Sequence, residues 1–273
     1  MEIDTLFQQL LRDPSPEHLR VYADLAQENG EPHGELIALQ CARELSSEAP
    51  SRREHELISQ LARELATRLG TLKAQPFWRR GFVDRLRLTL DEAGVNLAPL
   101  SGPRALALLR HVDLELASAD QLGDLSALWA RFPRLTSVES LRASGLLEGV
   151  FSPSIGRVAP LATALPSLRE LQLHGLEHDL EALVFPNLTF FAASRLNAST
   201  IPALVHARWP KLEVLELEFG AARPDEIEPL FGPLLDTRMS ESLRRVTVKS
   251  PWPEFFAAAL PRSLLGRGRE VSV

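Results

Sequence analysis

Two histidines four positions apart, His174 and His178, come nearest in type and spacing to a metal site. On a helix this spacing puts two imidazoles on one face, an arrangement that can hold zinc. Gly175 follows His174 directly, and the apolar alternation before it indicates the end of a strand. The two rings would then not share a helical face. We therefore expect a solvated loop at this point, with no metal and no cofactor.

A second candidate is a set of polar residues around one domain junction: Tyr22, Asp24, Glu35 and Arg80. If they converged in a pocket, they could support acid–base chemistry. The competing interpretation is that the carboxylates orient helix ends or pair with nearby arginines. The sequence contains no glycine-rich phosphate loop, no Gly-x-Ser-x-Gly and no His-Glu-x-x-His. We expect no catalytic residues, and an enzyme at this junction stays open as an alternative.

Arginines gather where the first strand is expected, at Arg79, Arg80, Arg85 and Arg87. Such a basic cluster could touch RNA or an acidic protein. The chain as a whole carries a net charge of -6 and has only one tyrosine to stack on bases. A solvated face is the simpler interpretation, and we expect no nucleic-acid partner.

The composition is that of a protein with a substantial core, since 45% of the 273 residues are hydrophobic. Cys41 is the only cysteine, which leaves no intramolecular disulfide and no cysteine-based metal cage. The first residues are acidic, unlike a secretory signal, and no apolar stretch is long enough to cross a bilayer. These features favour a cytoplasmic protein without a membrane partner.

Residues 1–76 have the pattern of a helical domain. Ser15 followed by Pro16 is a helix start, and a second helix is expected from Pro32 or His33. A longer helix, with leucines along one face, is expected from Ser51 to Leu69.

The second half of the chain repeats a short motif: an apolar residue, a proline, any residue and a leucine, followed by a strand pattern. The four copies are Phe132-Pro133-Arg134-Leu135, Leu165-Pro166-Ser167-Leu168, Phe185-Pro186-Asn187-Leu188 and Trp209-Pro210-Lys211-Leu212. Proline stops a helix without removing a donor inside the next strand. The pattern is that of the strand half of a leucine-rich repeat.

Aligning the chain on the first apolar strand position gives seven units. These positions are Val83, Leu109, Leu135, Leu168, Leu188, Leu212 and Leu243. The unit at Leu135 is irregular, because Ser140 falls where a second inward residue is expected. Helical pieces are expected at Ala119–Phe132 and Ser199–Trp209, and a last short strand at Glu270–Val273. The predicted fold is α/β: a helical N-terminal cap domain and, over residues 77–273, an irregular leucine-rich-repeat solenoid with a curved parallel sheet.

Three stretches resemble the bacterial repeat-companion domain, a module that precedes leucine-rich repeats. They are Leu11-Arg12-Asp13-Pro14, then Leu19 to Asp24, and Gly30-Glu31-Pro32-His33-Gly34-Glu35-Leu36-Ile37-Ala38-Leu39-Gln40. The segment Trp78-Arg79-Arg80-Gly81-Phe82-Val83-Asp84-Arg85-Leu86 resembles that family's entry into the first strand. The resemblance covers roughly residues 5 to 90 and implies family membership, with no enzymatic role to transfer. The repeats lack the asparagine ladder of the consensus, so a degenerate solenoid is expected.

If the repeat leucines point inward, the residues between them form the concave face of the sheet. On that face we expect an acidic middle around two apolar residues, the composition of an interface centre with a polar rim. The expected protein-binding residues are Asp113, Glu115, Glu139, Glu170, Phe190, Val214, Glu216 and Glu218. A loop or the helical domain covering Phe190 is the alternative.

The sequence thus predicts noncatalytic protein–protein recognition, by an adaptor or regulator whose partner could present a basic surface. An inhibitor or immunity-type protein that blocks one dedicated target is the second possibility within binding. The junction enzyme is the alternative of a different class. Polar groups converging in a pocket would favour the enzyme, whereas dispersed or paired groups would favour recognition.

Overall fold

A computed structural model describes residues 2–46, 48–91, 95–116, 124–145, 153–180, 183–220, 242–249 and 270–272. The chain divides into two compact units. The first comprises Met1–Arg87 and Ala98–His111, and the second comprises Leu88–Leu97 and Val112–Val273. The boundary predicted after residue 76 falls inside the first unit and stays a prediction.

Four helices open the first unit, close to where the sequence placed them. They are α1 (Ile3–Arg12), α2 (Pro16–Glu28), α3 (Pro32–Ser46) and α4 (Arg52–Leu69). The Ser15 hydroxyl accepts a hydrogen bond from the backbone N–H of His18 at the start of α2. The Ser51 hydroxyl does the same for Glu54 at the start of α4. Each cap satisfies a backbone donor that the helix leaves without a partner.

A β-hairpin completes the fold of the first unit. Strands β1 (Lys73–Arg79) and β2 (Phe82–Leu90) are neighbours, joined by the two residues Arg80 and Gly81. Both turn residues have positive φ, 49° and 78°. This backbone matches the tight hairpin turn that suits the twist of paired strands. Two short 3₁₀ turns follow, η1 (Ala98–Ser101) and η2 (Arg104–Leu106).

The hairpin and the helices of the first unit share a core. Phe82 of β2 lies 6.4 Å from Tyr22 and 6.5 Å from Phe7, measured between ring centroids. All three rings are buried. A second cluster of Leu36 and Leu57 is covered by the half-buried Trp78 of β1. The hairpin is thus part of the helical unit's core.

The second unit is built on a sheet whose strands follow chain order. In sequence they are β3 (His111–Leu116), β4 (Ser140–Gly145), β6 (Glu170–His174), β8 (Phe190–Leu196), β9 (Val214–Phe219), β10 (Arg245–Lys249) and β11 (Glu270–Ser272). The pairs from β4 onward are parallel. A small second sheet pairs β5 (Ser154–Arg157) with β7 (Leu176–Asp179). The α/β class with a large, mostly parallel sheet is confirmed.

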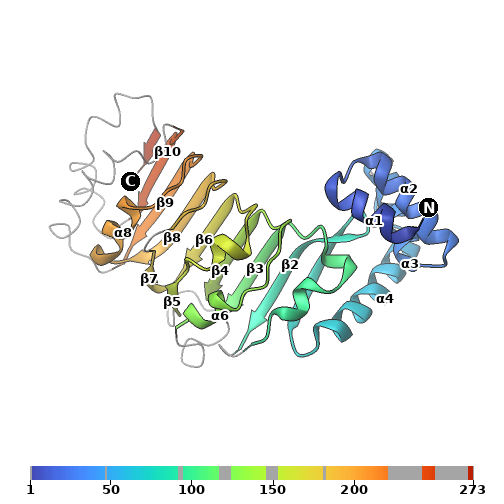
Figure 1. Cartoon of the computed structure of the whole chain (residues 1–273), viewed down its shortest axis with the longest axis horizontal. Coiled ribbons are helices and arrows are strands. Elements are labelled where there is room, and N and C mark those ends of the chain that lie inside the picture. Colours follow the sequence, from blue (N-terminus) through green and yellow to red (C-terminus); the bar gives the residue numbers. More distant parts are fainter. Residues whose placement is uncertain are drawn as a thin grey trace. The chain divides into compact units, whose positions relative to one another are not determined.

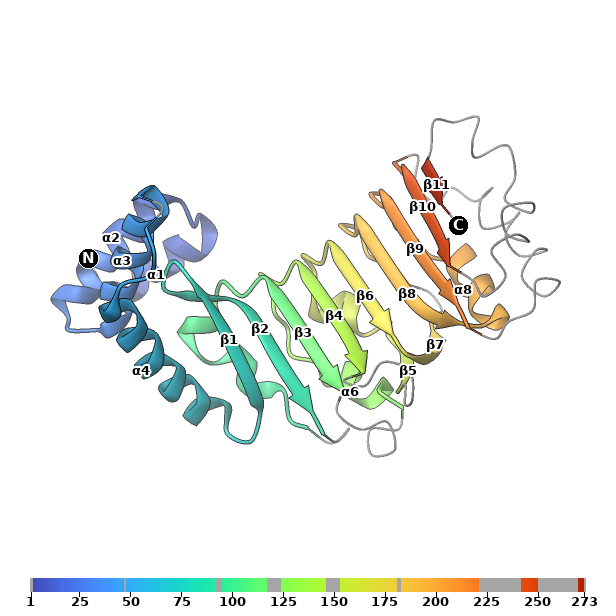
Figure 2. The same cartoon turned by 180° about the vertical axis from the view of Figure 1, so that it is seen from behind.

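Short helices lie on one face of this sheet: α6 (Ser126–Ala130), α7 (Leu161–Ala164) and α8 (Ile201–Val205), the last preceded by the 3₁₀ turn η3 (Ala198–Thr200). Figure 1 shows helices of the second unit in front of its strands. Figure 2 shows the opposite face, where no described helix lies in front of strands β4 to β10. Within the described residues the helices are shorter than the expected pieces, and residues 119–123 of the first expected piece lie outside the described part.

Outside the unit of β4, the inward residues are those that the repeat alignment selected. In β6 and β9 the paired leucines Leu171, Leu173, Leu215 and Leu217 are at most 1% exposed. Leu171 is in register with Phe191, which is in register with Leu215. Matching rows of apolar side chains stack from strand to strand, which is how short parallel strands bury a common core.

One unit is aligned differently from the prediction. Leu141 is in register with Leu171, and Ala143 with Leu173. Val138, which is fully buried, therefore takes the place assigned to Leu135. Leu135 is buried as well, but three positions earlier in the chain, so the proline motif of this unit misled the alignment.

The strand entries are held by a repeated hydrogen-bond pattern. The Glu139 carbonyl accepts from the N–H groups of Arg169 and Glu170, at 2.7 and 2.9 Å. The Arg169 carbonyl accepts likewise from Thr189 and Phe190, at 2.8 and 3.0 Å. The same pattern continues at the entries to β9 and β10. It fixes the register, and a one-residue slip would turn every leucine outward.

Candidate protein-binding face

Successive side chains of a strand point to opposite faces of the sheet. The residues that alternate with the buried leucines therefore lie on the face away from the short helices, which is turned towards the viewer in Figure 2 and which we call the outer face. The strand register arranges them in two rows across strands β4, β6, β8, β9 and β10. The first row is Ser140, Glu170, Phe190, Val214 and Arg245. The second row is Arg142, Gln172, Ala192, Glu216 and Thr247. Neighbouring residues of one row are about 4.8 Å apart, the spacing of paired strands.

The middle of the outer face is apolar. Phe190 and Val214 are direct neighbours in the first row, and both are half-buried. Ala192, the next outward residue along β8, is 7% exposed. Water reaches the aromatic ring and the valine in part. The pair is the apolar centre that the sequence predicted.

Carboxylates border this centre on both sides. Glu170 on β6 and Glu218 on β9 are exposed, and neither side chain has an ion-pair partner in the described part of the chain. Glu216 is 3.7 Å from the Arg245 guanidinium, and both side chains are partly exposed. That ion pair is weak because solvent screens it.

Glu139 does not lie in the row to which the repeat alignment assigned it, and its role in protein binding stays a prediction. Its place in the second row belongs to Arg142, which is in register with Gln172 and exposed. Glu139 instead lies at the entry to β4, where its carbonyl receives the next unit's N–H groups. The three-residue misalignment at Leu135 caused this difference in row. The outer face consequently has a cation on β4, and its acidic part is narrower than predicted.

The two predicted residues on β3 are less exposed than Glu170 and Glu218. Asp113 is only 9% exposed, and Glu115 is half-buried. Both already interact with other residues. The strand register places Glu170, Phe190, Val214, Glu216 and Glu218 on neighbouring strands of the outer face, and protein binding by all eight residues stays a prediction.

In the first unit, the family-like motifs meet at the hairpin turn. The Gly81 N–H donates to the Gln40 side-chain oxygen at 2.7 Å, and the His33 ring Nε2 lies 2.7 Å from the Gly81 carbonyl. Burial lowers the pKa of His33 to about 4. A neutral His33 therefore donates from Nε2 to the carbonyl. Both backbone groups of Gly81 are satisfied by side chains of α3.

A buried carboxylate extends this network. The Gln40 amide donates to Glu54 at 3.0 Å, and Arg43 donates to both Glu54 oxygens at 3.1 Å. Glu54 is 2% exposed, so its charge needs these partners. The motif residues are thus used to fasten the hairpin to α3 and α4.

The four residues of the enzyme alternative do not form a group. Tyr22 lies in the aromatic core, and burial raises its pKa. Asp24 is exposed. Glu35 pairs with Arg53, whose hydrogen bonds lower the Glu35 pKa, and Arg80 pairs with Glu44 at 2.7 Å. Each of the four side chains has a separate environment.

The histidine pair differs from its prediction. His178 in β7 is only 7% exposed, so the expected solvated loop is wrong at this residue. Burial lowers its pKa to about 4, with the Leu173 backbone opposing the shift and His174 adding to it. The His174 Nδ1 lies 3.2 Å from the Ser194 hydroxyl. Among the described residues, no three His, Cys, Asp or Glu side chains could hold a metal ion together.

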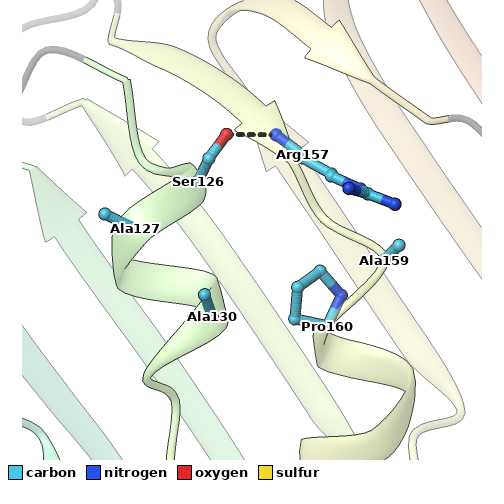
Figure 3. A pocket seen from close by; sticks show the side chains of 6 residues that line it. All are labelled: Ser126, Ala127, Ala130, Arg157, Ala159 and Pro160. Atoms are coloured by element: carbon cyan, nitrogen blue, oxygen red, sulfur yellow. Dashed lines mark hydrogen bonds between the residues drawn. The ribbon is translucent and has the colours of Figure 1, made fainter.

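A shallow pocket of about 480 Å³ lies beside α6, on the helix-covered face (Figure 3). Its lining is mostly small: Ala127, Ala130, Ala159 and Pro160, with Ser126 and Arg157. The Ser126 hydroxyl accepts from the Arg157 N–H at 2.7 Å and donates to Asp124 at 2.6 Å. These bonds order the local chain. Within the described residues, no helix is long and apolar enough to cross a membrane.

Comparison with known proteins adds no relative: no family model matches the chain, and neither a curated protein nor a solved structure is similar to it.

Proposed function

We propose that this chain is a noncatalytic recognition protein that binds a protein partner through the outer face of its second unit. The neighbouring pair Phe190 and Val214 carries the proposal. An apolar centre with charged residues on both sides is the composition of a protein-binding surface, where a few central residues supply most of the binding energy.

We infer further that the second unit is an irregular leucine-rich-repeat solenoid and that the helical first unit belongs to the repeat-companion family. The buried leucine rows and the repeated strand-entry bonds support the solenoid. The motif residues His33, Gln40 and Gly81, fastened to one another, support the family assignment. The single cysteine, Cys41, supports a reducing compartment such as the cytoplasm.

The protein would act as an adaptor or regulator. Its proposed recognition surface is a sheet face, and the polar side chains of the family-like motifs, His33 and Gln40, form hydrogen bonds to the protein's own hairpin turn. The dispersal of Tyr22, Asp24, Glu35 and Arg80 supports this choice over a junction enzyme.

The test is affinity capture from the cells that encode the protein, with three versions of the full chain as bait. Phe190→Asp places a charge in the apolar centre and should abolish capture of the partner. Leu45→Asp is the matched control, because Leu45 is 83% exposed on α3 in the other unit. It should capture as wild type does.

Melting temperatures of all three proteins must be measured alongside, since half-buried Phe190 contributes to packing. A partner retained by folded Phe190→Asp protein would place the binding site elsewhere and contradict the proposal.

A further inference from the structure

We propose that the partner places a lysine or arginine side chain over the Phe190 ring, with Glu170 as its counter-ion. This inference rests on the proposed function, because it requires binding at the outer face. It adds the chemistry of the central contact. The apolar pair Phe190 and Val214 does not by itself decide whether the partner places an apolar side chain or a cation on the ring.

The first argument is the position of Glu170. It is the direct neighbour of Phe190 in the first row, one strand away. Paired side chains at this spacing are close enough to act on one ligand group. Glu170 is exposed and has no ion-pair partner in the described part of the chain. Its carboxylate is therefore available to a cation that sits on the ring.

The second argument is the order of charges along the two rows. Val214, the neighbour of Phe190 on its other side, is followed along β9 by Glu216 of the second row. The cations of the rows, Arg142 and Arg245, lie on β4 and β10, two strands from Phe190. The charged row residues nearest to the ring are thus carboxylates.

The third argument is the ring itself. The face of an aromatic ring attracts a lysine or arginine cation, and a neighbouring carboxylate strengthens the attraction. The apolar stem of such a side chain can lie against Val214 while its charged end reaches Glu170. A purely apolar side chain would use the ring and leave the carboxylate without a role.

The experiment selects random peptides displayed on phage against the immobilised full chain, at low salt. Peptides that bind are synthesised, and their affinities for wild type, Glu170→Gln and Phe190→Leu are measured by titration calorimetry at two salt concentrations. Glu170→Gln keeps the shape and removes the charge, and Phe190→Leu keeps an apolar side chain and removes the ring. Leu45→Ala, on exposed α3 surface, is the control.

The selected peptides should share a lysine or arginine at one position. Glu170→Gln should weaken their binding about fivefold and flatten its salt dependence, because the screened ion pair is gone. Phe190→Leu should weaken it about threefold or more, by loss of the cation–ring attraction. Leu45→Ala should change nothing.

Two other results would separate a failure of the cation proposal from a failure of the proposed function. Peptides without a shared cation that still lose affinity for Phe190→Leu overturn the cation proposal and leave the outer face as the binding site. Peptides indifferent to both substitutions, or no selected peptide at all, overturn this inference and count against the proposed function too.

Discussion

Gly81→Ala should be among the most destabilising single-methyl changes in the first unit. Gly81 occupies the hairpin turn at a φ of 78°, a backbone conformation that side-chain-bearing residues rarely adopt. A Cβ added there would lie 2.1 Å from Ile37 Cγ1 and 3.1 Å from the Ile37 backbone. Ile37 is fully buried on α3.

Two costs add. The left-handed backbone costs alanine about 1 to 2 kcal/mol relative to glycine. Forcing a methyl group into a packed core costs a further 1 to 3 kcal/mol or so. Displacing the turn also stretches the Gly81 bonds to His33 and Gln40, both 2.7 Å long. The expected loss of stability is about 2 to 5 kcal/mol.

The control is Gly30→Ala, because Gly30 has a φ of 73° and no atom within 4 Å of an added Cβ. It should lose only the backbone cost, about 1 to 2 kcal/mol. Both variants are compared with wild type by urea unfolding followed by far-ultraviolet circular dichroism. Equal losses for Gly81→Ala and Gly30→Ala would refute the packing argument. The double variant Gly81→Ala/Ile37→Ala should be less destabilised than the sum of its parts, since the new methyl enters the space that Ile37 leaves.

Three further outcomes are expected. The free energy of unfolding should fall as the pH drops from 6.5 towards 4. In the folded protein His33 and His178 stay neutral, because their pKa is about 4, whereas in the unfolded chain the same two side chains become protonated near pH 6.5. The loss is on the order of 3 kcal/mol per histidine, and it is measured as the change of the urea midpoint with pH. Arg43→Met should lower the free energy of unfolding by about 3 kcal/mol, because it leaves the buried Glu54 carboxylate with the Gln40 amide as its one partner. Its control is Arg52→Met on the exposed surface, which should lower the free energy of unfolding by less than about 0.5 kcal/mol in the same measurement. Glu216→Lys/Glu218→Lys should slow association with a basic partner and reverse its salt dependence, checked by surface plasmon resonance, while the melting temperature stays near that of wild type.

The helices and the inward side of the strands could be predicted because each depends on local signals. Ser15 and Ser51 cap the helices expected from them. The leucine spacing fixes which residues of β6 and β9 are buried. The prediction for the unit at Leu135 failed because the motif Phe132-Pro133-Arg134-Leu135 lies three residues before the turn that leads into β4. Val138, and not Leu135, is the first inward residue of that unit.

The hairpin network could not be predicted, because its partners are far apart in the chain. His33 and Gly81 are 48 positions apart, and Gln40 and Gly81 are 41 apart. The two family-like stretches contain these residues, but the number of residues between the stretches does not indicate that they are in contact. The burial of His178 was missed for a similar reason. It depends on β7 pairing with β5 in a second sheet, and the alternation in the sequence does not indicate that sheet.

The most direct test of the central claim is photo-crosslinking of the full chain inside the cells that encode it. Benzoylphenylalanine is placed at Phe190 on the outer face in one protein, and at Leu45 on exposed α3 in the other. We predict a protein adduct from position 190 and none from position 45. An adduct from position 45 alone, with none from position 190 in a folded protein, would contradict the account.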